Sequence, residues 1–160
     1  MAVNEHKNLE DANRHNPKGF EVAANSTHLR KDSGGNLSWA PDTESFVVAL
    51  SDETTALTTG VAKITFRMPY AFTLTAVRAS VATAPVGSVL TVDINESGST
   101  ILSTKLTIDA GEYTSTTAAT PAVISDSALA DDSAITMDID TIGSGTAGAG
   151  LKVTLIGYQV

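Results

Sequence analysis

The sequence predicts an all-β protein, and three observations lead to that prediction. Apolar and polar side chains alternate with a period of two, most clearly over residues 62–95, which is the repeat of a pleated strand with one buried face. Turn-forming Pro and Gly residues separate the alternating runs. No stretch shows a helical period longer than one or two turns, the best candidate being residues 127–132.

The alternating runs assign side chains to a core face and to a solvent face. Apolar side chains form the core face of these strands, and Thr, Lys, Arg and Asp occupy the opposite face, so we expect that opposite face to meet water. The predicted core positions in the three clearest runs are Ile64, Phe66, Met68, Leu90, Val92, Ile94, Ile135, Met137 and Ile139. The last run, residues 151–158, is partly apolar on both faces, which favours a central or covered strand.

Residues 46–160 contain eight strand candidates separated by turn chemistry. Eight short strands at this spacing indicate an antiparallel β-sandwich or barrel, and a jelly-roll-like sandwich is the natural eight-strand solution. The candidates are residues 46–50, 62–68, 72–81, 88–95, 101–108, 122–124, 134–140 and 151–158.

Residues 1–45 differ from the rest and predict an extended N-terminal arm. The segment is polar, holds all three histidines, and has turn signals at residues 16–19 and 32–36. Between these turns, residues 20–24 and 27–30 are candidates for one short hairpin. The segment cannot bury enough apolar area to fold alone. We therefore expect it to anchor on its own β domain, on a sister subunit or on a different protein.

Composition narrows the classes of partner. The net charge is −8, and this argues against general binding of a nucleic acid backbone. No apolar run reaches the length needed to cross a bilayer, so no membrane partner is expected. The chain has no cysteine, which excludes thiolate metal sites and cysteine nucleophiles.

Candidate chemical sites are weak. Asp138 and Asp140 share one face of a strand, roughly 6.5–7 Å apart, a spacing that glycosidases use, but a solvated face is the stronger interpretation. Residues that could build a calcium loop lack the D-x-D-x-D-G pattern; they are Asp109, Glu112, Asp126, Asp131 and Asp132. We expect no catalytic residue, no metal and no cofactor.

Trp39 is the most informative single residue of the arm. It stands beside Pro41, where the arm meets the β domain. Two interpretations stay open: Trp39 fills a pocket on a neighbouring molecule, or it caps the base of its own domain.

Four long motifs resemble a β domain of tailed-bacteriophage virion proteins, such as head fibres and capsid decoration proteins. They are FRMPYAFTLTAVRAS, GSVLTVDIN, TILSTKLTIDAGE and GSGTAGAGLKVTLIG, within residues 48–160. The arm, with HNPKG at residues 15–19 and GNLSW at residues 35–39, is similar to the H-x-P-K-G…W segments of those proteins. The chain has no room for the repeats or coiled coils of long fibres, which favours a short decoration or head-fibre protein.

This resemblance implies a non-enzymatic virion protein, a homotrimer with a jelly-roll-like module, on the capsid surface. The arm would bind the major capsid protein or another virion protein. The alternatives are a tail or collar component and a receptor- or carbohydrate-binding module. The implied anchoring residues are His15, Pro17, Lys18, Gly19, Phe20, Leu29, Leu37 and Trp39.

Overall fold

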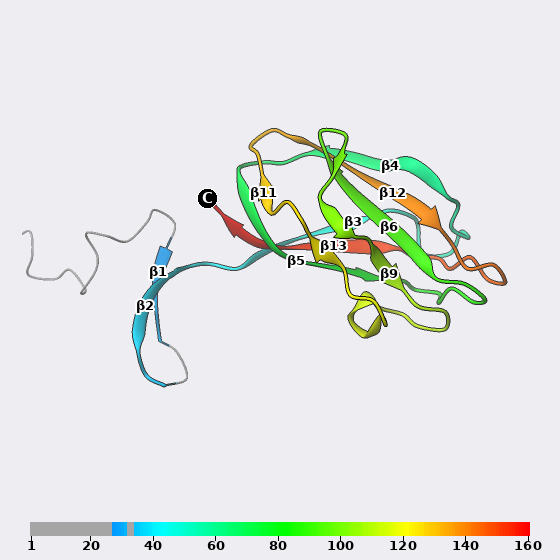
Figure 1. The fold of residues 1–160 in the computed structure, drawn as a ribbon, viewed down its shortest axis with the longest axis horizontal. Coiled ribbons are helices and arrows are strands. Elements are labelled where there is room, and N and C mark those ends of the chain that lie inside the picture. Colours follow the sequence, from blue (N-terminus) through cyan, green and yellow to red (C-terminus); the bar gives the residue numbers. More distant parts are fainter. Residues whose placement is uncertain (1–26, 32–33) are drawn as a thin grey trace, which may run out of the picture. The chain divides into compact units, whose positions relative to one another are not determined.

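The fold is all-β with antiparallel pairing in every sheet of the residues that the structure describes, which are 27–31 and 34–160 (Figure 1). The structure is a computed structural model. The predicted fold class is confirmed at this level. The chain divides after Asp42 into two units, residues 1–42 and residues 43–160.

The first unit contains a β-hairpin. Strand β1 (Thr27–Lys31) pairs with β2 (Leu37–Pro41) in a register that runs from Thr27 opposite Pro41 to Lys31 opposite Leu37. Gly35 in the connection has a φ of 87°, which a glycine adopts without strain. The sequence had instead suggested residues 20–24 as the partner of this strand, and those lie outside the described residues.

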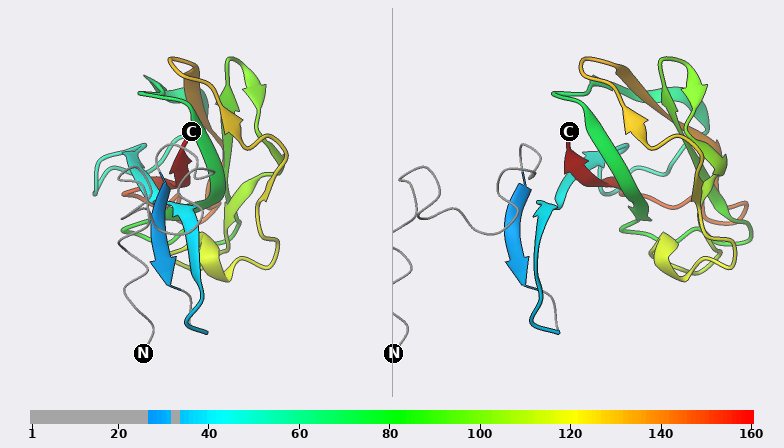
Figure 2. Two further views of the ribbon diagram at one scale, coloured as in Figure 1. Left: turned by 90° about the vertical axis from the view of Figure 1, so that its left-hand side faces the viewer. Right: turned by 60° about the vertical axis from the view of Figure 1, so that its left-hand side comes forward.

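The second unit is β-sandwich-like, with two larger antiparallel sheets as two layers and the two-stranded sheet of β8 (Leu102–Thr104) and β10 (Val123–Ile124) beside them (Figure 2). The first sheet has the order β11-β5-β13-β3, from strands Ala128–Leu129, Phe72–Ser80, Lys152–Gln159 and Glu44–Ala49. The second has the order β4-β12-β6-β7, from Gly60–Arg67, Ala134–Thr141, Leu90–Glu96 and Ser99–Thr100. Strand β13 is central in its sheet, as its two apolar faces predicted.

One expected strand, residues 101–108, is broken at Lys105. The first part, β8 (Leu102–Thr104), pairs with β10 (Val123–Ile124), whereas the second part, β9 (Leu106–Ile108), pairs with β6. The alternation of side chains continues through the break, because Leu102, Leu106 and Ile108 are all buried. The pattern alone therefore did not reveal the change of partner.

Two short elements also differ from expectation. Residues 127–132, considered as one helical turn, instead contain the two-residue strand β11, which pairs with the start of β5. A 3₁₀ helix, η4 (Ser115–Thr117), lies between the expected strands of residues 101–108 and 122–124. The β5 backbone explains the first difference, since the Leu74 N–H donates to the Ser127 carbonyl at 2.7 Å.

The core lies between the two sheets and contains most of the positions that alternation assigned to it. Met68, Leu90, Val92, Ile94, Ile135, Met137 and Ile139 are at most 1% exposed. Ile64 and Phe66, on edge strand β4, are partly buried and pack against this cluster. An edge strand has a neighbour on one side only, which leaves its inward side chains more accessible.

The turn between β6 and β7 offers a test of local backbone strain. Ser97 and Gly98 have φ values of 49° and 87°, the combination of a two-residue type I′ hairpin turn. Asn tolerates the left-handed region better than Ser. We expect Ser97→Asn to raise the free energy of unfolding by about 0.5 kcal/mol. Urea denaturation measures the change, and Ser99→Asn, in the strand, is the control that should give no gain.

Candidate functional site

The hairpin has one apolar face, and three predicted anchoring residues share it. Leu29 lies directly opposite Trp39, and Leu37 lies opposite Lys31. Because side chains two residues apart point to the same side of a strand, Leu29, Leu37, Trp39 and Pro41 share one face. Thr27 and Lys31 lie at the two ends of the same face. Leu37 is 65% exposed and Leu29 is 39% exposed. We call these four residues the hairpin apolar face.

The opposite face of the hairpin is polar. His28 Nε2 lies 2.9 Å from Asp42 Oδ2, and Arg30 pairs with the other oxygen of the same carboxylate. These side chains are about half exposed or more, so solvent screens the pairs and their contribution to stability is small. The hairpin therefore has one side that carries the His28, Arg30 and Asp42 cluster, and a second side on which the four apolar residues lie beside Lys31.

The remaining predicted anchoring residues are His15, Pro17, Lys18, Gly19 and Phe20, and all lie outside the described residues. Of the anchoring residues, the structure brings together Leu29 of β1 with Leu37 and Trp39 of β2. Sequence reasoning did not include Pro41 among them, although Pro41 closes the same face opposite Thr27.

Asp138 and Asp140, the pair considered for glycoside chemistry, serve the architecture of the second sheet. Asp138 Oδ1 accepts the Ala62 N–H at 2.6 Å, and Oδ2 accepts the Asn95 side-chain amide at 3.2 Å. Ala62 has a φ of 46° at an irregular point of the β4–β12 pairing. The carboxylate of Asp138 thus supports a strained backbone position, and Asp140 is engaged by Lys105 Nζ at 2.6 Å.

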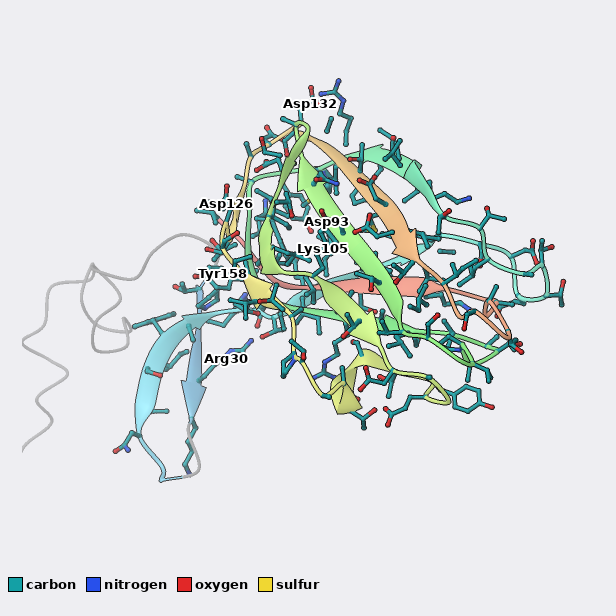
Figure 3. All side chains as sticks on the ribbon, turned by 45° about the vertical axis from the view of Figure 1, so that its right-hand side comes forward. Arg30, Asp93, Lys105, Asp126, Asp132 and Tyr158 are labelled. Carbon is teal, nitrogen blue, oxygen red and sulfur yellow. The ribbon has the colours of Figure 1, made fainter. Side chains whose placement is uncertain are left out.

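Lys105 joins Asp140 to a buried carboxylate, Asp93. Figure 3 shows Lys105 and Asp93 close to each other in the sandwich. Asp93 is 6% exposed, and its Oδ2 lies 2.9 Å from Lys105 Nζ. Its Oδ1 accepts the Thr100 hydroxyl at 2.6 Å and the Ile94 N–H at 2.9 Å. The hydrogen bonds to Asp140 and then to Asp93 raise the pKa of Lys105 above its ordinary value.

The burial of Asp93 corrects the sequence interpretation. Alternation along residues 88–95 assigns Asp93 to the solvent face together with Thr91 and Asn95. In the structure, Lys105 and Thr100 cover this position. No local signal marks Asp93, because its burial depends on a strand that changes partner at Lys105, twelve residues later.

The acidic residues considered for calcium do not converge. Asp109 Oδ2 accepts the Ala119 N–H at 2.8 Å, which joins two segments ten residues apart, and Asp126 Oδ1 accepts the Ala128 N–H at 3.1 Å within one turn. Figure 3 shows Asp126 and Asp132 at separate places on the domain. Over residues 27–31 and 34–160, no three His, Asp or Glu side chains gather as metal ligands. In the same residues, no helix has both the length and the hydropathy to cross a membrane.

Comparison of the chain with protein-family models, with curated proteins and with solved structures finds no match in any of the three. The arrangement of the hairpin and of the sandwich is therefore what bears on function.

Proposed function

We propose that this chain is a non-enzymatic structural protein of a tailed-phage virion, a capsid decoration or short head-fibre protein. It anchors to the major capsid protein through its N-terminal arm and projects a β domain outward. The observation that carries the proposal is the hairpin apolar face, which lies within the arm segment that resembles phage fibre and decoration proteins.

The energetics of the hairpin support an anchoring role. An isolated two-stranded hairpin is marginally stable in water. Leu37 and Leu29 leave apolar area exposed on it, and burial of a leucine side chain is worth about 1.5–3 kcal/mol. A docking surface that covers this face would stabilise the hairpin and the complex together.

The strand order supports a jelly-roll assignment for the β domain. We number the main strands one to eight in chain order, and we count β7 and β9 together as the fifth: β3, β4, β5, β6, β7 with β9, β11, β12 and β13. The first strand then pairs with the eighth, and the second pairs with the seventh. The third pairs with the sixth and the fourth with the fifth. This nesting of antiparallel pairs, split over two sheets, is the arrangement of two Greek keys in a jelly roll.

The proposed mechanism is thermodynamic. A ligand that binds only the assembled capsid lattice stabilises that lattice by mass action. In a homotrimer, three arms would bind as one unit, and this raises the effective affinity. The described carboxylates fit a structural protein, since Asp93, Asp138 and Asp140 are engaged in bonds within the sandwich.

Substitution of Leu37 tests the anchoring role directly. Leu37→Ser removes apolar area from the hairpin face, and we expect about tenfold weaker binding to capsids that lack the protein. Co-sedimentation of purified protein with such capsids gives the affinity. Val61→Ser, which changes an exposed valine on β4 outside the hairpin, is the control and should bind as the wild type does. Wild-type affinity for Leu37→Ser and for Trp39→Ala would refute the anchoring role.

The copy number of this protein per virion distinguishes a location on the head from a location on the tail. Quantitative mass spectrometry of purified virions should give amounts comparable to the major capsid protein if the chain decorates the capsid. A few copies per particle would instead place the arm on a portal, collar or tail protein. Absence from virions would refute the virion proposal altogether.

A further inference from the structure

The outer edge of β5 is paired at both of its ends but not in its middle. At one end, Thr73 lies opposite Ala128 of β11. At the other end, the Ala79 N–H donates to Ser115 Oγ at 2.8 Å, and the Val81 N–H donates to the Tyr113 carbonyl at 3.0 Å. Between these ends, residues 75–78 have no strand partner on this edge within the described chain.

A groove of about 540 Å³ lies along this free edge. One wall of the groove is the middle of β5, and the other wall is the segment around β10. Strand β10 pairs with β8 and not with β5. Val77, Leu106, Ala122 and Ile124 contribute an apolar lining, and Ser115 and Thr116 of η4 add hydroxyl groups. The groove is therefore bounded by two strand segments and lined by the side chains that a strand would meet.

The backbone of Val77 is oriented to accept a strand. Along a strand, the N–H and C=O groups of every second residue point to the same edge. Since Ala79 and Val81 use their N–H groups on the outer edge, the N–H and C=O of Val77 point to that edge as well. Residues 75–78 span about 10 Å, which matches a partner segment of about four extended residues.

The charge of the groove indicates which kind of peptide segment would bind there. Among the described residues that line it, Arg78 is the charged one, and it is exposed. Because Arg78 alternates with the inward-facing Val77 and Ala79, a partner strand would place a polar residue beside Arg78 and small apolar residues toward the lining.

We propose that this groove binds an extended peptide segment of a partner protein, which adds to β5 as a strand and places a Glu or Asp beside Arg78. Strand addition of this kind takes affinity from main-chain hydrogen bonds and specificity from alternate side chains. The site is distinct from the hairpin apolar face, and the proposal does not depend on the virion assignment.

Titration of the full chain with the peptide STVEVTS, followed by amide NMR, tests the proposal. We expect saturable shifts of the Val77 and Arg78 amides, with a Kd below about 1 mM, and slower hydrogen exchange at Val77. The peptide STPEPTS, whose prolines lack N–H donors, is the backbone control and should not bind. Absence of saturable shifts with STVEVTS, or equal binding of STPEPTS, would overturn strand addition.

Reversal of the charge at residue 78 tests whether the groove prefers peptides with an acidic residue. Arg78→Glu should weaken STVEVTS binding about fivefold and strengthen STVKVTS binding by a similar factor. Arg78 is exposed, so the variant is expected to fold, and the wild-type chain should prefer STVEVTS over STVKVTS independently of any variant. Shifts at the same amides caused by maltohexaose but not by any peptide would show a saccharide site and would contradict the proposal.

Discussion

Gly157→Ala should lower the free energy of unfolding by about 3 kcal/mol, because a methyl group at this position has no space. A Cβ there would lie 2.0 Å from the Thr73 carbonyl oxygen and 2.6 Å from the Phe72 ring. The crowding arises where the β13–β5 register shifts, between Ile156 and Gly157. Both neighbours are fixed, since the oxygen is backbone and Phe72 is buried at 1% exposure. Urea or guanidinium unfolding measures the loss.

Gly145→Ala is the matched control for this change. A Cβ at Gly145 would meet its nearest atom, the Val86 carbonyl oxygen, at 3.4 Å, and Gly145 has no positive φ that an L side chain would strain. We expect a change within about 1 kcal/mol for the control. Equal stability of the two alanine variants would show that the β5–β13 irregularity can open to accept a side chain.

Lys105→Met should cost about 2 kcal/mol, because it leaves the buried Asp93 carboxylate without its cation. Removal of one partner from a fully buried pair costs about 3–5 kcal/mol. Lys105 is 43% exposed at its side chain, so water replaces part of the lost interaction and the expected cost is lower. Met keeps the apolar length of the lysine stem. Lys63→Met, which removes a lysine that within the described residues donates to the Thr58 hydroxyl, is the control and should change stability by about 0.5 kcal/mol or less.

The pH dependence gives a second measure of the same ion pair. The carboxylates raise the pKa of Lys105 in the folded chain above its unfolded value of about 10.4. A raised pKa stabilises the fold below the unfolded value, and that stabilisation is lost as the pH rises through the folded value. The difference between wild type and Lys105→Met should therefore stay constant from about pH 7 to pH 9 and shrink only above about pH 10.4. A difference that vanished by pH 9 would contradict the assignment of the cation to Lys105.

Much of the sandwich was predictable because its signals are local. The alternation around Leu90, Ile94 and Met137 identified strands and their buried faces correctly, since the period of two depends only on the pleat of each strand. Turn residues such as Gly98 marked where strands end, because their backbone preferences are properties of the residue. Strand ends shifted by one or two residues, as for the predicted segment 46–50 and the observed Glu44–Ala49.

The candidate site was predictable in part for the same reason. Leu29, Leu37 and Trp39 stood out as apolar residues in a polar segment. That they share one face depends on the pairing of β1 with β2, since a shift of one residue in either strand would move its side chains to the opposite face.

Local patterns in the chain were thus enough for the fold class, for most strands and for the inward faces of the core. Pairing between distant segments decided the rest: the exchange of partners at Lys105, the burial of Asp93 and the unpaired middle of β5. The physical reason is that burial and main-chain hydrogen bonding depend on which strand arrives alongside. Asp93, Thr91 and Asn95 look equivalent in the sequence, and only the approach of Lys105 and Thr100 makes Asp93 a buried carboxylate.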